Sequence, residues 1–228
     1  MKFAAWSYSR LHDYDTCPRK AKLKHLDKIT EPPNKSMARG AAIHRMAEAY
    51  VKGELKALPE ELAQFEQEFK DLRKRKAATE DRWAFDKDWR TLDDFFHKDT
   101  VARLVVDALA VKLKPARGNK SKVQAEATVI DYKTGQRYGS NAEQIQLYAM
   151  GTFAKFPDVD TVVVQLWYLD LGEMDEETFT REKHYPTMRE YWEKRPKKLM
   201  SDTAFKPTPG GHCTRCYYSK SKHKDCEF

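Results

Sequence analysis

The sequence lacks the features of a membrane or secreted protein. No apolar run approaches the roughly 20 residues that a membrane-spanning helix needs. Residues 1–7 contain no long apolar stretch of the kind found in signal peptides. We therefore expect a soluble, cytoplasmic protein with no membrane partner.

Internal repeats and low-complexity segments are absent as well. The sequence also has no Gly-Lys-Ser/Thr loop, which helicases use to bind phosphate. Any unwinding of a nucleic acid would therefore have to come from a partner protein.

Cysteine is scarce, and its placement is specific. The chain contains four cysteines: Cys17, Cys213, Cys216 and Cys226. Without a secretion signal disulfides are not expected, and Cys-x-x-Cys is a metal-ligand spacing. Four thiolates suit one zinc ion or one iron–sulfur cluster, with His212 and His223 as substitute ligands, whereas four unrelated free thiols are the alternative. A shared centre would join the first helix to the C-terminal tail.

The net charge of +7 is concentrated at the two ends of the chain. Residues 1–30 carry a balance of +4 and residues 194–224 a balance of +8, which leaves −5 for the remainder. If the ends meet in space, they form a surface suited to a polyanion. Solvated lysine-rich faces are the alternative.

Composition and periodicity predict a folded α/β protein. With 228 residues, 40% of them apolar, the chain can bury the core of one domain. Strands 101–113 and 122–133 are expected to pair across a turn at 115–119. The apolar run 161–169 predicts a strand covered on both sides, and the helix before it completes a right-handed βαβ unit. Helices are predicted over residues 7–15, 36–53, 60–76, 140–153 and 186–201, with Ser7, Ser36 and Ser140 as N-caps, and a strand with an irregular connection over 82–96.

The second hairpin strand ends in an acid, a spacer and a lysine. Because side chains alternate across a strand, Asp131 and Lys133 point to the same side. A carboxylate and an ammonium there suit a magnesium-type site that hydrolyses a phosphodiester. A surface Asp and Lys at the close of a strand are the alternative.

The first hairpin strand carries a carboxylate inside an apolar run. Alternation places Leu104, Val106 and Ala108 on one face and Asp107 on the other. Burying a carboxylate is costly unless it is paired or binds a cation, and Asp131 is its expected companion.

Two helices carry further candidates. Gly40 and His44 lie four residues apart on one face, where the glycine lets another backbone approach and the histidine can point into the gap. A hydrogen-bonded helix histidine is the alternative. Gln144 and Tyr148 likewise lie one turn apart on one face of their helix.

Together these residues resemble the PD-(D/E)XK nuclease superfamily in its RecB-like branch. The resemblance is closest to the iron–sulfur exonucleases typified by the CRISPR adaptation nuclease and by related phage proteins, and it covers most of the chain. The matching motifs are residues 7–11 through 17–20, Gly40-x-x-x-His44, Asp107, Asp131-Tyr132-Lys133, Gln144-x-x-x-Tyr148 and the four cysteines. In one departure, the insert 217–225 separates Cys226 from Cys216 by more than in the better-known members.

The resemblance implies an α/β, restriction-endonuclease-like core, with a central mixed sheet flanked by helices. Residues 1–228 would form a single nuclease domain in which 1–30 and 203–228 make a metal-cluster subregion. The N- and C-terminal segments would be joined at a four-cysteine centre. Its expected cofactor is a [4Fe-4S] cluster, with zinc as the alternative, held by Cys17, Cys213, Cys216 and Cys226.

The resemblance also implies roles for the site residues. His44, Asp107, Asp131 and the Tyr132 carbonyl would hold one or two Mg²⁺ or Mn²⁺ ions, and the imidazole favours manganese. Lys133 would orient or deprotonate the attacking water and stabilise charge on the phosphate. Gln144 and Tyr148 would position the substrate or support the ligands.

The implied activity is that of a metal-dependent deoxyribonuclease, an exonuclease on single-stranded or end-bearing DNA. A helicase or a recombination or replication protein is the implied partner, in the host cytoplasm if the chain is phage-encoded. Two alternatives stay open. One is a nucleic-acid-binding module with a structural zinc or iron–sulfur centre, and the other is an inactive member that serves as an assembly factor.

Overall fold

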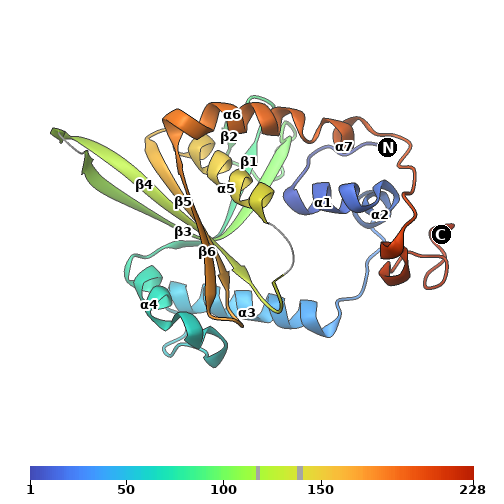
Figure 1. Cartoon of the computed structure of the whole chain (residues 1–228), viewed down its shortest axis with the longest axis horizontal. Helices are drawn as coiled ribbons and strands as arrows, with labels where there is room; N and C mark the ends of the chain where they lie inside the picture. Colours follow the sequence, from blue (N-terminus) through green and yellow to red (C-terminus); the bar gives the residue numbers. More distant parts are fainter. Residues whose placement is uncertain (117–118, 138–140) are drawn as a thin grey trace.

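A six-stranded mixed sheet forms the centre of the molecule, with helices on both faces (Figure 1). The computed structural model describes residues 1–116, 119–137 and 141–228. β4 and β5 run parallel, whereas the other neighbouring strands are antiparallel. In sheet order the strands are β2 (Thr91–Leu92), β1 (Ala78–Phe85), β3 (Ala102–Ala116), β4 (Asn119–Lys133), β5 (Val159–Tyr168) and β6 (Glu173–Thr180).

The helices divide between the two faces of the sheet. α5 and α6 cover one face, and α3 and α4 cover the other (Figure 1). No helix in the described part of the chain is both long and apolar enough to cross a membrane. The helices are α1 (Tyr8–Thr16), α2 (Pro18–Ala21), η1 (Lys22–Leu26, a π-helix), α3 (Lys35–Lys52), η2 (Glu60–Phe65, a 3-10 helix), α4 (Glu66–Lys74), α5 (Ala142–Lys155), α6 (Arg181–Lys194), α7 (Lys197–Ser201) and η3 (Gly211–Arg215, a 3-10 helix).

Each face of the sheet has its own hydrophobic core. The first core joins the sheet to α1, α5 and α6 and includes Trp6, Phe153 and Trp192. The second core joins the sheet to α3 and α4 and includes Ile43 and Phe69. The sheet is therefore packed against helices on both faces.

The predicted hairpin and crossover are confirmed. β3 and β4 pair antiparallel, and α5 connects β4 to its parallel neighbour β5. Residues 117–118 of the predicted turn lie outside the described residues. The prediction that residues 161–169 are buried on both faces is wrong for the first half of this segment. Thr161 and Val163 are only half-buried there, because the second core includes no residue of the segment before Trp167 and Leu169.

Three boundaries differ from the prediction. The segment 60–76 divides into η2 and α4, because the chain enters it from extended backbone at Pro59 and first forms a tighter turn. The segment 186–201 divides at Pro196, and α6 begins earlier and accommodates Pro186 within its length. β6 was not predicted, because its acidic sequence lacks apolar alternation and it forms by pairing with β5.

Of the three predicted N-caps, one is confirmed, one is replaced by a neighbouring residue and one lies outside the described residues. Ser7 caps α1 as predicted, its hydroxyl accepting from the Arg10 N–H. The predicted cap Ser36 lies inside α3, because Asn34 takes the cap position and accepts from the Met37 N–H at 2.9 Å. Ser140, predicted to cap α5, lies outside the described residues.

The two chain ends pack together beside the sheet (Figure 1). The Tyr218 hydroxyl donates to the Ile29 carbonyl, and the Tyr14 hydroxyl donates to Asp202. The basic segments 1–30 and 194–224 are therefore neighbours in space.

Candidate active site

The candidate site lies where β3 separates from β4. The pairing of these strands, among the described residues, ends at Ala108 and Ile130. Beyond this point the Tyr132 N–H donates to Oδ2 of Asp107 at 2.6 Å instead of to a strand carbonyl. The Asp107 carboxylate thus occupies the gap between two strands.

The side-chain alternation of β3 is interrupted at the same place. Leu104 and Val106 belong to the first core, whereas Ala108 belongs to the second. The prediction that these three share a face is therefore wrong, because the alternation breaks between Val106 and Ala108, where the pairing of β3 with β4 stops. Opposite Asp107, Glu80 of β1 has a φ of 49°, in the left-handed region that non-glycine residues seldom adopt.

Three potential metal ligands meet at this irregularity. One ligand atom from each of His44, Glu80 and Asp107 lies within 4.8 Å of the other two. Nδ1 of His44 lies 3.1 Å from Oδ1 of Asp107. Burial disfavours the charged imidazole, but the hydrogen bond and the charge of Asp107 outweigh it and raise the pKa of His44. Burial, followed by the negative charge of Asp107, raises the pKa of Glu80.

A second group of polar side chains lies on the α5 side of β4. Oδ1 of Asp131 accepts from the Tyr148 hydroxyl at 2.7 Å and from Nε2 of Gln144 at 3.2 Å. Oδ2 of Asp131 pairs with Nζ of Lys133 at 2.6 Å. Asp131 is only 6% exposed. Burial raises its pKa, an effect that Lys133 opposes and Asp107 reinforces.

Lys133 is held by contacts on both sides. Besides its ion pair with Asp131, its ammonium donates to Oε1 of Gln144 at 2.9 Å. Gln144 also donates to the Tyr148 hydroxyl at 3.0 Å, so the two α5 residues act as one support. The ammonium is therefore fixed at a strand end, next to the carboxylate of Asp131.

The donor set suits a hard divalent cation. Carboxylate oxygens with one imidazole match the preferences of Mg²⁺ and, more so, Mn²⁺. One feature favours such a charge. Glu80 and Asp107 repel each other, which contributes to the raised pKa of Glu80. A cation between the two carboxylates would relieve this repulsion.

α3 lies close to the turn after β4, at the position where Gly40 was expected to allow a close approach. A Cβ added at Gly40 would lie 2.9 Å from Oγ1 of Thr134, so the close neighbour is a side chain rather than a backbone. Asp170 ties this turn down by accepting from Arg39 and from the Gly135 N–H. These contacts hold the helix carrying His44 against the strand carrying Lys133.

The structure brings the predicted site residues into two adjoining groups. His44 and Asp107 contact each other, and Lys133, Gln144 and Tyr148 all contact Asp131. The N–H of Tyr132 links the groups, and the predicted role of its carbonyl stays a prediction. Glu80 was missed by the sequence analysis, and its only sequence signal is an acid within the short segment before Trp83.

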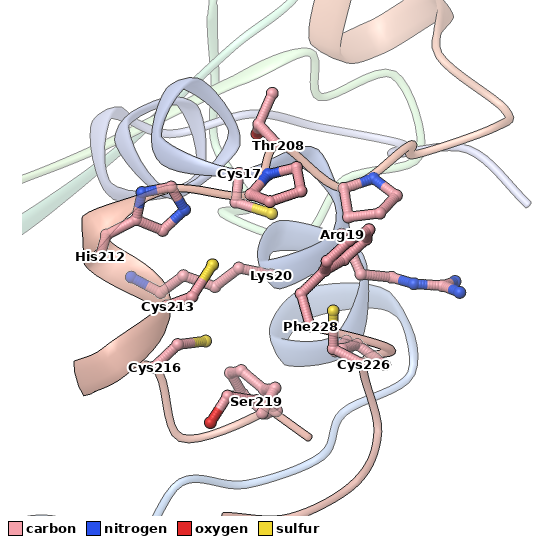
Figure 2. Close-up of a pocket in the computed structure, with 14 residues that line it drawn as sticks. Cys17, Arg19, Lys20, Thr208, His212, Cys213, Cys216, Ser219, Cys226 and Phe228 are labelled. Carbon is pink, nitrogen blue, oxygen red and sulfur yellow. The ribbon is translucent and has the colours of Figure 1, made fainter. Parts of the chain in front are cut away.

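The four cysteines line a single pocket between the chain ends. Cys17 comes from the junction of α1 and α2, Cys213 from η3, Cys216 from the residue that directly follows η3, and Cys226 from the tail. Figure 2 shows their sulfur atoms turned into the same space. Hydrogen bonds to the sulfur, mainly from Thr208, outweigh burial and lower the pKa of Cys17, whereas burial raises the pKa of Cys216.

The spacing of the sulfurs bears on which metal could bind. A tetrahedral zinc with Zn–S bonds of about 2.3 Å draws its four sulfurs to about 3.8 Å from one another. In the described residues, the one group of three or more ligand atoms within 4.8 Å of one another is that of His44, Glu80 and Asp107. The four cysteines therefore line one pocket without forming a compact group of this kind.

Comparison with known proteins now identifies the class. The family model of the PD-(D/E)XK nuclease superfamily matches residues 5–221. The chain therefore belongs to the PD-(D/E)XK nuclease superfamily, and its mixed sheet flanked by helices is consistent with a restriction-endonuclease-like core.

The searches of curated proteins and of solved structures do not narrow the family further. A search of curated proteins found no match. Among solved structures, the crystal structure of SSO0001 is similar at 15% sequence identity with a TM-score of 0.48, covering 96% of this chain and 85% of that one.

Proposed function

We propose that this protein is a metal-dependent deoxyribonuclease that works as an exonuclease on single-stranded or end-bearing DNA. The observation that carries the proposal is the Lys133 ammonium, fixed between Asp131 and Gln144 beside the His44, Glu80 and Asp107 group. Membership of a nuclease superfamily agrees with this chemistry. A surface Asp–Lys pair would not need a buried, hydrogen-bonded carboxylate.

His44, Glu80, Asp107 and Asp131 are the residues that would hold one or two Mg²⁺ or Mn²⁺ ions. When bound, the ion supplies a water of lowered pKa and neutralises charge on the scissile phosphate. Glu80 is added to the ligand set that the motifs alone imply, because one of its carboxylate oxygens lies within 4.8 Å of a ring nitrogen of His44 and a carboxylate oxygen of Asp107.

Lys133 acts on the phosphate and the attacking water. Its ammonium carries hydrogens beyond those given to Asp131 and Gln144, and it directs them toward negative charge that builds on the phosphate oxygens. Gln144 and Tyr148 act as positioning residues, because they hold Asp131 and Lys133 at the strand end. This fixed arrangement avoids reorganisation during the reaction.

The basic chain ends supply the grip on DNA. Since segments 1–30 and 194–224 lie together, their positive charges act on the same stretch of phosphate backbone. Such binding depends strongly on salt and little on sequence.

A [4Fe-4S] cluster held by Cys17, Cys213, Cys216 and Cys226 is the second part of the proposal. The pocket that all four cysteines line supports a common metal centre, and four thiolates are the ligand set of a [4Fe-4S] cluster. Its role would be to fasten the N-terminal helices to the C-terminal tail.

The activity is tested with linear and circular single-stranded DNA, with and without Mg²⁺ or Mn²⁺. We expect digestion of the linear strand only, from an end, and none in the presence of a chelator. Cleavage of the circle would contradict the exonuclease assignment, and binding without any cleavage would favour the non-catalytic alternative.

A further inference from the structure

A groove beside the active site contains features that metal-ion chemistry does not use. It is continuous with the site, because Gln144 and Tyr148 form part of its wall. Its other walls come from α1, from strand β3 and from the loop before β3. Four of the residues that line the groove are Arg10, Phe95, Phe96 and Arg103.

Two aromatic rings, those of Phe95 and Phe96, line this groove. Phe96 is 66% exposed, an unusual position for a large apolar ring. Its ring meets that of Phe95 edge-on at 5.1 Å, and the guanidinium of Arg103 lies over it at 4.8 Å. The Phe96 N–H donates to Asp94, and Arg103 donates to the Phe95 carbonyl. The exposed ring is thus held in place rather than loosely displayed.

The groove is also positively charged. Arg10 and Arg103 both line it, and no carboxylate does so among the described residues. Neither arginine has an ion-pair partner in the described part of the chain; their hydrogen bonds go to the carbonyls of Ala5 and Phe95. Burial and the positive charge of Arg103 lower the pKa of Arg10, in keeping with two cations that line the same groove. An anion between them would relieve this repulsion.

We propose that this groove is a subsite for single-stranded DNA, in which an unpaired base stacks on Phe96 and the adjoining phosphate binds Arg10 and Arg103. The proposal rests on the proposed nuclease function and adds to it the form of the substrate. Bases in a duplex are stacked on their own neighbours, so their faces cannot reach Phe96. The subsite therefore selects strands with unpaired bases near the scissile phosphate.

The stacking is tested by binding of a labelled oligothymidine to the Lys133→Ala protein, in which the strand stays intact. Adding Phe96→Ala should weaken binding about 5-fold or more, the range found for loss of one aromatic–base stack. Phe96→Trp should restore it. Leu171→Ala, an exposed apolar change in the turn between β5 and β6, should leave binding unchanged.

An oligonucleotide without bases separates stacking from general weakening. On an abasic strand the Phe96→Ala effect should disappear, because no base is present to stack. An equal loss on thymidine and abasic strands would overturn the proposal. Arg10→Gln should lower the salt dependence of binding by about 0.7 in the logarithmic slope, the value of one phosphate contact on a single strand.

The outcome is separable from that of the nuclease proposal. If the wild type cleaves linear single strands while Phe96→Ala binds and cleaves them equally well, the subsite is wrong and the nuclease stands. If the wild type cleaves nothing but Phe96→Ala weakens only single-strand binding, the subsite stands and the nuclease is wrong.

Discussion

Asp131 is the residue on which both parts of the candidate site depend. One of its oxygens accepts two hydrogen bonds from α5, and the other faces Lys133. A carboxylate this buried is stable only with compensating positive charge. Lys133 supplies that charge from the protein, and a bound divalent ion would supply more.

Glu80 provides the first prediction at this scale. Glu80→Gln keeps the shape of the side chain and removes one charged ligand, so Mn²⁺ should bind at least about 10-fold more weakly, a loss that even indirect changes to metal sites produce. Titration calorimetry with Mn²⁺ measures this directly, without relying on activity. Asp81→Asn, the next position on β1, is the control. Equal Mn²⁺ affinity in the wild type and Glu80→Gln would remove Glu80 from the ligand set.

Single residues could be predicted where the pattern is local. Asp131 and Lys133 share a side because strands alternate, and Gln144 and Tyr148 share a face because helices repeat. Glu80 could not be predicted in this way. Its position depends on the register of β1 against β3 and on an irregular backbone angle, which no short window of sequence specifies.

At the scale of elements, a buried carboxylate joins the N-terminal helices. Asp13 of α1 is 5% exposed and pairs with Lys20, Lys24 and His25 of the following helical turns. Burial acts against its charge, but hydrogen bonds from His25 and the two lysines outweigh it and hold the pKa of Asp13 well below its usual value. This cluster fixes α1 against η1.

Asp13→Asn should therefore lower the free energy of unfolding by about 2–4 kcal/mol at neutral pH. Because the folded pKa is depressed, the stabilisation is complete above the unfolded value of about 4 and is lost as the pH falls through the folded one. Urea unfolding at pH 7 and near pH 3 tests this. The gap between wild type and variant should narrow at the lower pH, and a constant gap would refute the electrostatic explanation.

Helices and strands could be predicted where their own sequence shows a clear hydrophobic periodicity. The β3–β4 hairpin and the helix between β4 and β5 follow from strong periodicity, whereas β6 is acidic and becomes a strand only by pairing with β5. The break in side-chain alternation between Val106 and Ala108 of β3 could not be predicted from the sequence either. It arises where β3 leaves β4, a property of three strands together rather than of one.

At the scale of the whole molecule, the chain ends close on each other around the cysteine pocket. Cys17 lies far from the other three in sequence, yet all four line one pocket (Figure 2). Their count and spacing alone led to the expectation of a shared centre. The kind of metal could not follow from spacing along the chain, because it depends on how far apart the sulfurs stand in space.

Protein purified without oxygen should accordingly be brown and contain iron and sulfide, with four irons per chain. Cys17→Ser should lose this iron and lower the melting temperature, since the pocket then loses its only ligand from the N-terminal segment. Metal analysis and visible absorption provide the measurement. One zinc per chain with no iron would contradict the cluster.

The central claim is that Lys133 acts in metal-dependent DNA cleavage, and its removal tests this most directly. Rates of digestion of end-labelled single-stranded DNA with Mn²⁺ should be compared for the wild type, Lys133→Ala and the control Lys155→Ala on the far end of α5. Loss of a charge-stabilising group predicts a fall of about 10²–10⁴-fold for Lys133→Ala alone, with DNA binding retained. Unchanged metal-dependent cleavage by Lys133→Ala would contradict the account.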